Sequence, residues 1–374
     1  MRFTVDRATL LKALAHVQSV VEKRNTIPIL ANLMLAVRNG RLSLSATDME
    51  IAVVEDVAAM TTDDGATTAP AATLYEIVRR LPDGADIELH HAGGDAPLEL
   101  RAGHYRTSLM VLPTEDFPSM MAGSLPYHFA LPASALRTLI DRTRFAISME
   151  ETRDYLNGIF LHATDSEGVG LLRAVATDGH RLARVEQPLP EGAANMPGVI
   201  VPRKTVLELR KLLEETTEAV EVGLSDTRIQ FRVGPVTLTS KLIDGTFPEY
   251  ERVIPRTNDK VLRVGKRDFS DAVARVAAIS TERSRPVKLS LTRDHLVLSA
   301  VSPEQGTATE ELDAERVAYD ASPLDIGFQA RYLSDITDQI TEKVEFRFSD
   351  GTAPTVVQDA ADAGALYVLM PIRV

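Results

Sequence analysis

The chain has 374 residues, of which 44% are hydrophobic, and a formal net charge of −12 at pH 7. Its length predicts two or three domains. The net charge argues against a protein that coats DNA with its whole surface, because attraction to phosphates requires clustered Lys and Arg. The net charge permits a protein that presents a basic lining to DNA and an acidic outer surface. The absence of cysteine excludes disulfides, thiol catalysis and thiolate zinc sites.

No apolar run reaches membrane-spanning length, and the amino terminus carries no charged-then-apolar export signal. The longest apolar run, 27–37, contains Pro28 and Asn32 and is typical of a buried strand. We therefore expect no membrane partner and a cytoplasmic location.

The predicted elements follow the same order three times, about 130 residues apart. In the first copy an amphipathic helix at 5–21 precedes a strand–turn–strand hairpin at 42–53 and a second helix at 71–81. The later copies lie at 132–147, 172–185 and 203–213, and at 266–279, 296–305 and 330–340. This spacing is that of a whole small domain rather than of a solenoid repeat, so the sequence predicts three copies of one fold.

The hairpin at 172–185 holds the best candidates for catalysis, Asp178 and His180, which would share a face if both lay on a strand. Asp48 occupies the corresponding turn of the first copy without a histidine, and the third copy has Ser302 followed by Pro303. Asp in a turn commonly bonds its own backbone, and no nucleophile or second carboxylate completes a site. Turn formation is the favoured interpretation, with a hydrolase as the alternative, and no catalytic residue is predicted.

Cofactor and metal motifs are missing from the sequence. No phosphate-binding loop, dinucleotide fingerprint, zinc-protease motif or nucleophile elbow occurs. His90 and His91 are adjacent, so on a strand their rings would point to opposite faces and could not share a metal. The sequence therefore predicts no cofactor and no metal site.

Basic residues recur on the polar faces of the predicted helices, for example Arg137 and Arg144 in one helix and Arg203 and Lys204 in the next. A single such face is typical of a solvated surface. Recurrence at equivalent places in three copies favours DNA binding, because a closed arrangement would gather these faces on one surface.

Several motifs resemble the family of the bacterial DNA polymerase III beta subunit, the DNA sliding clamps. The resemblance spans essentially the whole chain and is most specific at 155–158, 175–182, 201–204 and 247–250. It implies an α+β fold of three clamp domains, at 1–122, 123–255 and 256–374, with helices inside and antiparallel sheets outside. It also implies a ring-shaped homodimer of pseudo-sixfold symmetry that holds duplex DNA without reading its sequence and is not an enzyme.

For DNA contact, the resemblance points to Arg24, Arg153, Tyr155, Arg203 and Lys204. Relatives commonly carry a basic pair where this chain has Ala72 and Thr73, and an aromatic residue where it has Asp154. We expect four other arginines to compensate: Arg79, Arg80, Arg137 and Arg144.

For partners, the resemblance places a peptide groove between domains two and three. Apolar residues would form its trough, Met370 would adapt to several ligands, and Gly179 would let a peptide backbone approach. The expected partners are the polymerase alpha subunit, the clamp loader, and other polymerases and repair proteins that carry short peptide motifs. We expect the protein to meet them at the nucleoid. The predicted groove residues are Leu156, Thr177, Gly179, His180, Arg181, Leu182, Pro248, Arg252, Val253, Val368, Met370, Pro371, Ile372 and Arg373.

For the dimer, the resemblance pairs an edge of domain one with an edge of domain three. Gly306 and Thr307 replace acidic residues common in relatives, so edge-to-edge strand pairing and apolar contact should dominate over ion pairs. The predicted interface residues are Arg101, Arg106 and Leu109 against Ala278, Ile279, Glu304, Glu310 and Glu311. An open adaptor of three domains that binds peptides but never encircles DNA is the alternative.

Overall fold

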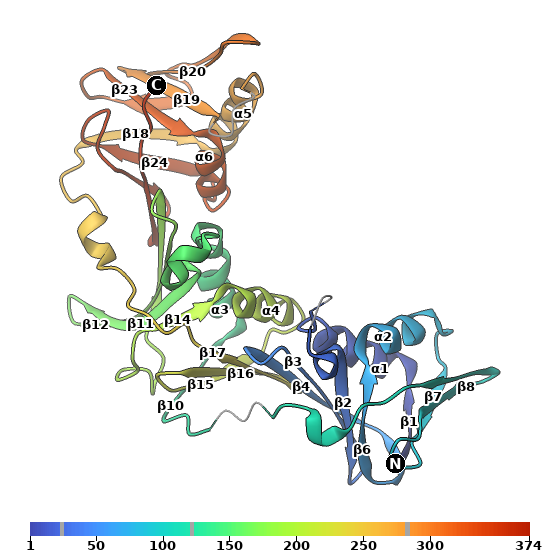
Figure 1. Cartoon of the computed structure of the whole chain (residues 1–374). Helices are drawn as coiled ribbons and strands as arrows, with labels where there is room; N and C mark the ends of the chain where they lie inside the picture. Colours follow the sequence, from blue (N-terminus) through green and yellow to red (C-terminus); the bar gives the residue numbers. More distant parts are fainter. Residues whose placement is uncertain (23–25, 120–122, 281–284) are drawn as a thin grey trace. The chain divides into compact units, whose positions relative to one another are not determined.

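The computed structural model describes residues 1–22, 26–119, 123–280 and 285–374. These residues form two compact units (Figure 1). Unit one comprises Met1–Arg137, Pro190–Pro197 and Lys204–Leu242, and unit two comprises Thr138–Leu189, Gly198–Arg203 and Ile243–Val374. Unit one thus holds the first repeat and half of the second, and unit two holds the other half and the third repeat.

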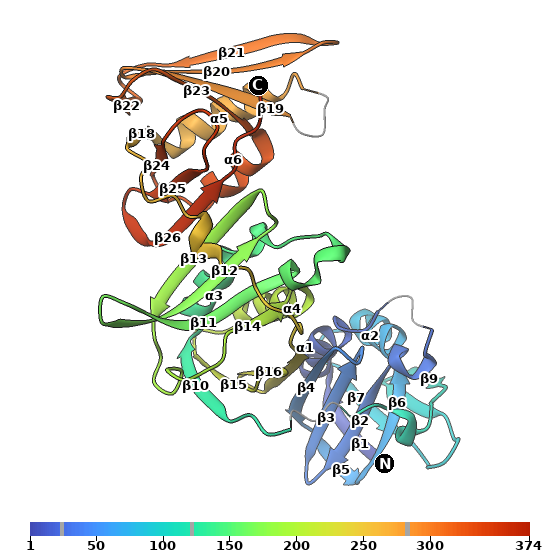
Figure 2. The same ribbon diagram turned by 60° about the vertical axis from the view of Figure 1, so that its left-hand side comes forward.

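Each repeat contributes two α-helices to the described part of the chain. The first helices are α1 (Arg7–Gln18), α3 (Ala133–Asp141) and α5 (Lys266–Ala277), and the second helices are α2 (Ala71–Arg80), α4 (Arg203–Glu214) and α6 (Ala330–Thr337). Within their units, α1 packs beside α2 and α5 beside α6, as Figures 1 and 2 show. The predicted helix pairs are therefore confirmed.

The strands of unit one are β1 (Arg2–Asp6), β2 (Asn32–Arg38), β3 (Arg41–Thr47), β4 (Ile51–Ala58), β5 (Met60–Asp63), β6 (Gly65–Pro70), β7 (Asp86–His90), β8 (Leu98–Ala102), β9 (Tyr105–Leu109), β10 (Tyr127–Pro132), β15 (Ala219–Leu224), β16 (Arg228–Val233) and β17 (Val236–Lys241). Two short 3-10 helices, η1 (Pro28–Ala31) and η2 (Thr114–Asp116), accompany them.

The strands of unit two are β11 (Gly158–Ser166), β12 (Val169–Thr177), β13 (Arg181–Pro188), β14 (Val199–Pro202), β18 (Lys260–Gly265), β19 (Pro286–Thr292), β20 (His295–Ser302), β21 (Gly306–Leu312), β22 (Val317–Tyr319), β23 (Leu324–Gln329), β24 (Lys343–Phe348), β25 (Thr355–Asp359) and β26 (Asp362–Leu369). The 3-10 helices here are η3 (Arg144–Ala146), η4 (Glu151–Leu156) and η5 (Tyr250–Val253).

Three predicted boundaries are wrong for local reasons. Helix α1 begins at Arg7 because Asp6 is its N-cap, whose carboxylate accepts a hydrogen bond of 3.0 Å from the amide of Thr9. The strand expected from residue 27 begins only at Asn32, because Pro28 opens a 3-10 turn. Helix α3 ends at Asp141, and the remainder of the predicted helix forms η3.

Strand pairing joins neighbouring repeats into continuous sheets. Unit one contains an eight-stranded sheet in the order β10-β15-β16-β17-β4-β3-β2-β6, and unit two a nine-stranded sheet in the order β14-β11-β12-β13-β26-β25-β24-β18-β22. In each, four middle strands of one repeat join the first and last strands of the next, which number four in unit one, and in unit two β22 adds a fifth. We call the β4–β17 contact with its flanking helices the first joint, and the β13–β26 contact with its flanking helices the second joint.

The two joints have the same register. Val53 lies opposite Leu238 in the first joint, and Ala183, at the equivalent position, lies opposite Tyr367 in the second. The turns that precede β4 and β13 also accept equivalent bonds. In the first joint the amide of Lys241 donates to the carbonyl of Glu50 at 2.9 Å, and in the second the amide of Met370 donates to the carbonyl of His180 at 2.9 Å. The joints are therefore two copies of one contact.

Two smaller sheets remain, and each ends in an edge strand. Unit one has a five-stranded sheet in the order β5-β1-β7-β8-β9, and unit two has a four-stranded sheet in the order β21-β20-β19-β23. Strand β9 is the counterpart of β17, and β21 is the counterpart of β4. The two strand types that pair in both joints are thus the ones left at these edges.

A histidine lies between two carboxylates in the first joint. Nδ1 of His16 on α1 lies 2.7 Å from Glu55 of β4, and Nε2 lies 3.1 Å from Glu215, which follows α4. Burial alone would lower the pKa of His16, but the bonds and charges of Glu55 and Glu215 outweigh it and raise this pKa above its ordinary value. In its protonated form the ring ties the first helix of one repeat to the residue that follows the second helix of the next.

Replacement of His16 by Gln should reduce the stability of the protein more at pH 6 than at pH 8.5. Because the folded-state pKa is raised, the stabilisation is fully present below the unfolded pKa of about 6.5 and is lost as the pH rises through the folded value. Chemical denaturation of wild type and variant across this range measures the difference. A destabilisation that is the same at both pH values would contradict a charged His16.

Candidate functional site

The turn between β12 and β13 is held by its own side chains. One carboxylate oxygen of Asp178 accepts bonds from the amides of His180 at 2.9 Å and Arg181 at 3.0 Å. Asp48 binds the amides of Glu50 and Ile51 in the same way, each at 2.8 Å. The predicted turn role of Asp178 is confirmed, and its carboxylate is occupied by backbone rather than poised beside a catalytic base.

Gly179, at the tip of this turn, has a positive φ of 88°. The equivalent Met49 has a φ of 78°, so the conformation belongs to the turn and is strained for a side chain. A Cβ on Gly179 would also lie 3.1 Å from a guanidinium nitrogen of Arg153. The absence of a side chain at Gly179 therefore leaves room for the guanidinium of Arg153 beside the turn.

Arg181 is buried and supports the turn from below. It donates to Asp335 on α6, to Asp178 at 3.1 Å and to the carbonyl of Phe145 at 2.6 Å. Its guanidinium lies over the ring of Tyr332, 4.5 Å from the centroid. Such a group presents few donors to a ligand, so Arg181 holds the turn against α6 and supports the groove wall rather than lining it.

An apolar cluster covers the face of the nine-stranded sheet beside this turn, at the second joint. Leu182 of β13 and Val368 of β26 are opposite each other in the ladder, and the chain leading from repeat two to repeat three lays Phe247 and Tyr250 over them. Tyr155, Phe160, Ile243 and Ile254 pack against its edge. The cluster comprises Leu156, Val175, Leu182, Ile200, Phe247, Tyr250, Val356, Leu366 and Val368.

The first joint shares this scaffold but not this surface. Its residues at the positions of Val175, Leu182, Ile200 and Val368 are Ser45, Ala52, Thr68 and Thr239. The two threonines make polar contacts: Gln230 donates to Thr239 at 3.1 Å, and Thr68 donates to the carbonyl of Leu112 at 2.8 Å. Of the two joints, only the second carries an apolar surface that a peptide side chain could cover.

A polar network fixes the connecting chain to the sheet. Arg173 of β12 donates to the hydroxyl of Tyr250 at 2.7 Å, to Glu251 at 2.6 Å and to Glu186 at 2.7 Å. His162 Nε2 lies 2.9 Å from the same hydroxyl. Burial lowers the pKa of His162 and raises that of Tyr250, so both are neutral at pH 7.

The carboxyl-terminal residues run from β26 onto the edge strand β23. The amide of Ile372 donates to the carbonyl of Gly327 at 2.8 Å, and the two residues form an isolated bridge. A Cβ on Gly327 would lie 2.2 Å from Val374 and 2.8 Å from the carbonyl oxygen of Ile372. Any side chain at position 327 would therefore collide with the tail residues that follow Met370.

The predicted groove residues gather on unit two, although they differ in exposure. Leu156, Leu182 and Val368 are buried, whereas Met370 and Val253 are 38% and 52% exposed at the rim. A hollow of about 890 Å³ opens along the connecting chain and includes Pro248 and Arg252. Of the remaining predicted residues, Thr177 ends β12, Gly179 and His180 lie in the turn, and Pro371, Ile372 and Arg373 lie in the tail.

Sequence reasoning missed the groove's supports, Phe160, Arg173, Tyr332 and Asp335. Phe160 stacks on Phe247 with ring centroids 4.9 Å apart, and the others hold the turn or the connecting chain as described above. The motif at 247–250 was the available signal, since an aromatic pair around a proline in a connecting chain needs a surface to cover.

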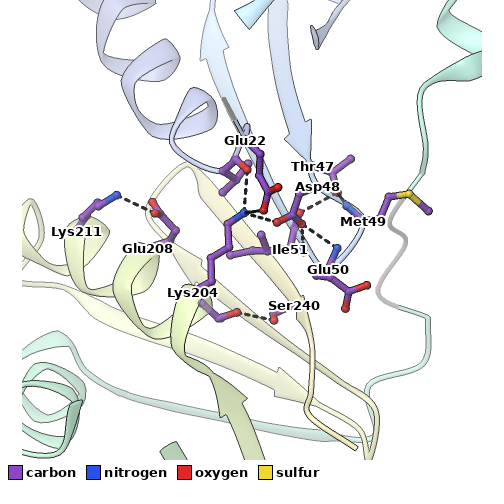
Figure 3. Close-up of polar contacts among 12 residues, drawn as sticks. Glu22, Thr47, Asp48, Met49, Glu50, Ile51, Lys204, Glu208, Lys211 and Ser240 are labelled. Carbon is purple, nitrogen blue, oxygen red and sulfur yellow. Dashed lines mark hydrogen bonds and ion pairs between the residues drawn. The ribbon is translucent and has the colours of Figure 1, made fainter. Parts of the chain in front are cut away.

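Among the residues predicted for DNA contact, Lys204 is the most constrained (Figure 3). From the start of α4 its ammonium bonds Asp48 of the first-repeat turn, Glu22 at 3.1 Å and the carbonyl of Val20 at 3.3 Å. Burial alone would lower the pKa of Lys204, but these two carboxylates outweigh it and raise the pKa. Its charge is therefore largely used inside unit one.

The other predicted cations occupy varied surroundings. Arg137 is half-buried and donates to the carbonyls of Leu213 and Thr216 at the end of α4, so its expected place on the solvent face is wrong. Arg203 is exposed, whereas Arg79 and Arg80 pair with Glu76, Arg144 with Asp141 and Arg153 with Glu150. Tyr155 packs at the apolar cluster, and Arg24 lies outside the described residues.

The predicted interface residues lie at or near the two sheet edges. Arg106 and Leu109 are on β9, and Arg101 on β8 pairs with Glu99 at 3.3 Å. On the other side, Glu310 and Glu311 are on β21, where Glu310 pairs with Arg275 of α5. Glu304 is exposed in the turn before β21, and Ala278 and Ile279 follow α5.

Metal chemistry finds no support in the arrangement of side chains. Over residues 1–22, 26–119, 123–280 and 285–374, no three His, Asp or Glu side chains are grouped to hold an ion. His91 is buried and His90 lies 3.9 Å from Glu99, so the adjacent histidines have separate surroundings. Nor does any helix in those ranges have the length and apolar character to cross a membrane.

Three repeats with two helices each, sheets fused from one repeat to the next, and an apolar groove at one joint together define a DNA clamp. Residues 1–121, 130–249 and 251–373 match the N-terminal, central and C-terminal domains of the DNA polymerase III beta subunit. The chain belongs to this family, and its function is that of a sliding clamp, a processivity subunit without catalytic activity.

Similar proteins match over the whole chain. The beta sliding clamps of Caulobacter vibrioides and Escherichia coli K12 are 52% and 39% identical to it, with all of this chain and all of each relative covered. A crystal structure of the Caulobacter crescentus clamp has a TM-score of 0.97 at 52% identity, covering 100% of this chain and 99% of that one. A Bartonella birtlesii clamp bound to griselimycin has a TM-score of 0.96 at 47% identity, covering both chains fully.

Substitution of Gly327 by Val should weaken binding of a clamp-binding peptide by roughly tenfold, because the new side chain displaces the tail that carries Met370. Fluorescence anisotropy with a labelled peptide measures the change. As a control, the same substitution in a chain that lacks residues 372–374 should add nothing to the effect of the deletion. A further loss in that background would mean that Gly327 acts by another route.

Proposed function

We propose that two copies of this chain close head to tail into a ring around duplex DNA, with domain boundaries at 1–122, 123–255 and 256–374. The support comes from the sheets that remain unfused. Every other sheet half is paired with its complement from the next repeat, and β9 and β21 are the complementary edges left at the two ends of the chain. Long edges attract further strands, and closure by a two-fold axis covers both.

The internal joints supply the register of this third joint. Ala308 is equivalent to Val53, because Ala308 pairs with Ala300 as Val53 pairs with Ala46. Tyr105 is equivalent to Val236, because each is the first paired residue after a hairpin turn. By this equivalence β21 runs antiparallel to β9 of the partner subunit, with Ala308 opposite Thr107. The central pair, Thr107 and Ala308, has small side chains, which lets the two backbones approach for strand pairing.

Side-chain burial supports the same closure. Val20 and Ala146 hold the fourteenth position counted from the start of α1 and α3, and both are fully buried in their units. Ile279 holds this position after α5 and stays partly exposed. A hollow of about 570 Å³ lined by Ala72, Ile77 and Tyr105, among others, lies beside β9. In the proposed ring, Ile279 of one subunit fills the hollow of the other.

DNA contact in such a ring is loose and independent of sequence. Of the predicted cations, Arg203 is exposed and the best placed, with Arg79, Arg80, Arg144 and Arg153 able to exchange their surface carboxylates for phosphates. Few strong contacts suit a protein that must slide, since enclosure rather than affinity prevents loss.

The groove on unit two recruits partners to the enclosed DNA. A short, apolar, disordered motif would lay side chains on the apolar cluster while Met370 and Val253 adapt at the rim. We assign to this groove the polymerase alpha subunit, the clamp loader, other polymerases and repair proteins, acting in the cytoplasm at the nucleoid. That they share one groove makes their binding mutually exclusive.

Met370→Ala should weaken a polymerase-derived peptide by about tenfold without changing the dimer, because the groove and the sheet edges are separate surfaces. Titration of the peptide together with sedimentation of the variant measures both effects. Thr239→Val at the first joint is the matched control and should leave peptide affinity within about twofold. Unchanged affinity for Met370→Ala would remove this residue from the groove.

The closed ring should stay on nicked circular DNA after loading and leave linear DNA from its ends. Thr309→Pro should give a folded monomer that is retained on neither, because in the register of the internal joints the amide of Thr309 faces the open edge of β21 and proline removes this donor. Sedimentation and gel filtration of protein–DNA mixtures provide the readouts. Equal, salt-sensitive loss of the wild type from both DNAs would favour the open adaptor, and a dimeric Thr309→Pro protein would exclude the proposed edge.

A further inference from the structure

Each internal joint carries an ion pair between the turn of one repeat and the second helix of the next. In the first joint, Asp48 in the turn binds Lys204, the second residue of α4. In the second joint, Arg181 at the end of the turn binds Asp335, the sixth residue of α6. The two pairs have opposite polarity but connect the same two elements, which we call the turn–helix ion pair.

Both pairs are more than surface contacts. Asp48 and Arg181 have side chains only 7% and 5% exposed. Each also belongs to a larger set of bonds, since Lys204 reaches Glu22 and a carbonyl, as Figure 3 shows, and Arg181 reaches Asp178 and a carbonyl. Removing one member of such a buried pair leaves the other charge unpaired, which costs far more than losing an exposed pair.

The residues at the same positions of the third joint can be identified from the structure. The hydroxyl of Ser302 accepts a bond of 3.3 Å from the amide of Gln305, three residues on, as Asp48 does from Ile51 and Asp178 from Arg181. Ser302 therefore occupies the aspartate position of the turn. In the strand register that makes Ala308 the counterpart of Ala183, Gly306 is the counterpart of Arg181, so the third turn is one residue longer.

The helix positions follow by counting from the end of the preceding strand. Strands β6, β14 and β23 end at Pro70, Pro202 and Gln329, and α2, α4 and α6 begin at the next residue. Ala72 is thus the counterpart of Lys204, and Glu76 is the counterpart of Asp335. Glu76 is exposed on α2 and pairs there with Arg79 and Arg80 of its own helix.

We propose that the joint between subunits lacks the turn–helix ion pair that both internal joints contain, and that positions 72, 302 and 306 thereby set how long the ring stays closed. Neutral residues, Ala72, Ser302 and Gly306, stand at three of the four positions that carry the pairs elsewhere. This inference rests on the ring closure proposed above. Separation of the subunits then breaks strand pairing and apolar contact but no buried ion pair.

A single substitution restores a pair of the second-joint type. Gly306 itself has a positive φ of 104°, which a side chain would strain, so Gln305→Arg instead places a guanidinium one residue earlier, in the turn that faces the native Glu76 of the partner subunit. Gln305 is exposed, so the substitution should not disturb folding. Subunit exchange between dimers labelled with donor and acceptor fluorophores should slow by about five- to tenfold, and the slowing should shrink as salt is added.

Two controls separate the pair from general charge effects. Glu76→Gln should abolish the slowing in the Gln305→Arg background but alter exchange of the native chain less than twofold. The double variant Ala72→Lys with Ser302→Asp rebuilds the first-joint pair and should slow exchange, whereas the neutral Ala72→Gln with Ser302→Asn should not. Thermal unfolding confirms that each variant is folded.

Slowing by Gln305→Arg that persists with Glu76→Gln, or no slowing by either rebuilt pair, would overturn the inference. So would a native dimer that dissociates several-fold faster on Glu76→Gln alone, since Glu76 would then already be paired across the joint. The ring closure itself is judged separately by Thr309→Pro: a monomer there with no effect of the rebuilt pairs refutes the ion-pair inference alone.

Discussion

Backbone hydrogen bonding between strands of neighbouring repeats is the interaction on which the rest of this molecule depends. Strand β4 bonds β17 and β13 bonds β26 in one register, which makes each sheet continuous across two repeats. Because side chains alternate across a strand, that register decides which residues share the outer face. A slip of β26 by one residue would turn Val368 away from the face that carries Leu182 and disrupt the groove.

One scaffold thus yields two surfaces of different character. The first joint closes its outer face with hydroxyl and amide bonds around Thr68 and Thr239, whereas the second leaves an apolar cluster beneath an exposed methionine. Charge is divided in a similar way. Lys204, placed by the helix pattern among the DNA-facing cations, is held by Asp48 and Glu22, which leaves the acidic protein with few cations for DNA.

Much of the fold was predictable because the sequence repeats itself. Three hairpins and three helix pairs at equal spacing gave the architecture, and the turn role of Asp178 followed from the same residue in another copy without a histidine. Helix ends were less predictable, since the cap at Asp6 and the turn at Pro28 depend on local geometry. The family resemblance, rather than any pattern of spacing, brought together groove residues from the turn, the connecting chain and the tail.

Partners of buried charges could not be predicted. Arg137 and Lys204 have the periodicity of a solvent face, yet one donates to the end of α4 and the other bonds a turn more than 150 residues earlier in the chain. Arg181 reads as a groove residue and instead lies beneath the turn, against α6. Only three-dimensional placement shows whether a long cationic side chain meets a carboxylate or water.

The central claim is that the contact between subunits repeats the register of the internal joints. The native chain has no cysteine, so a Thr107→Cys, Ala308→Cys variant can form a disulfide only between introduced thiols, whose Cβ atoms would be about 5 Å apart in directly opposite positions. Mild oxidation should give a covalent dimer, whereas Ser108→Cys with Ala308→Cys, shifted by one residue, should not. The reverse result, or cross-linking by neither pair, would contradict the claim.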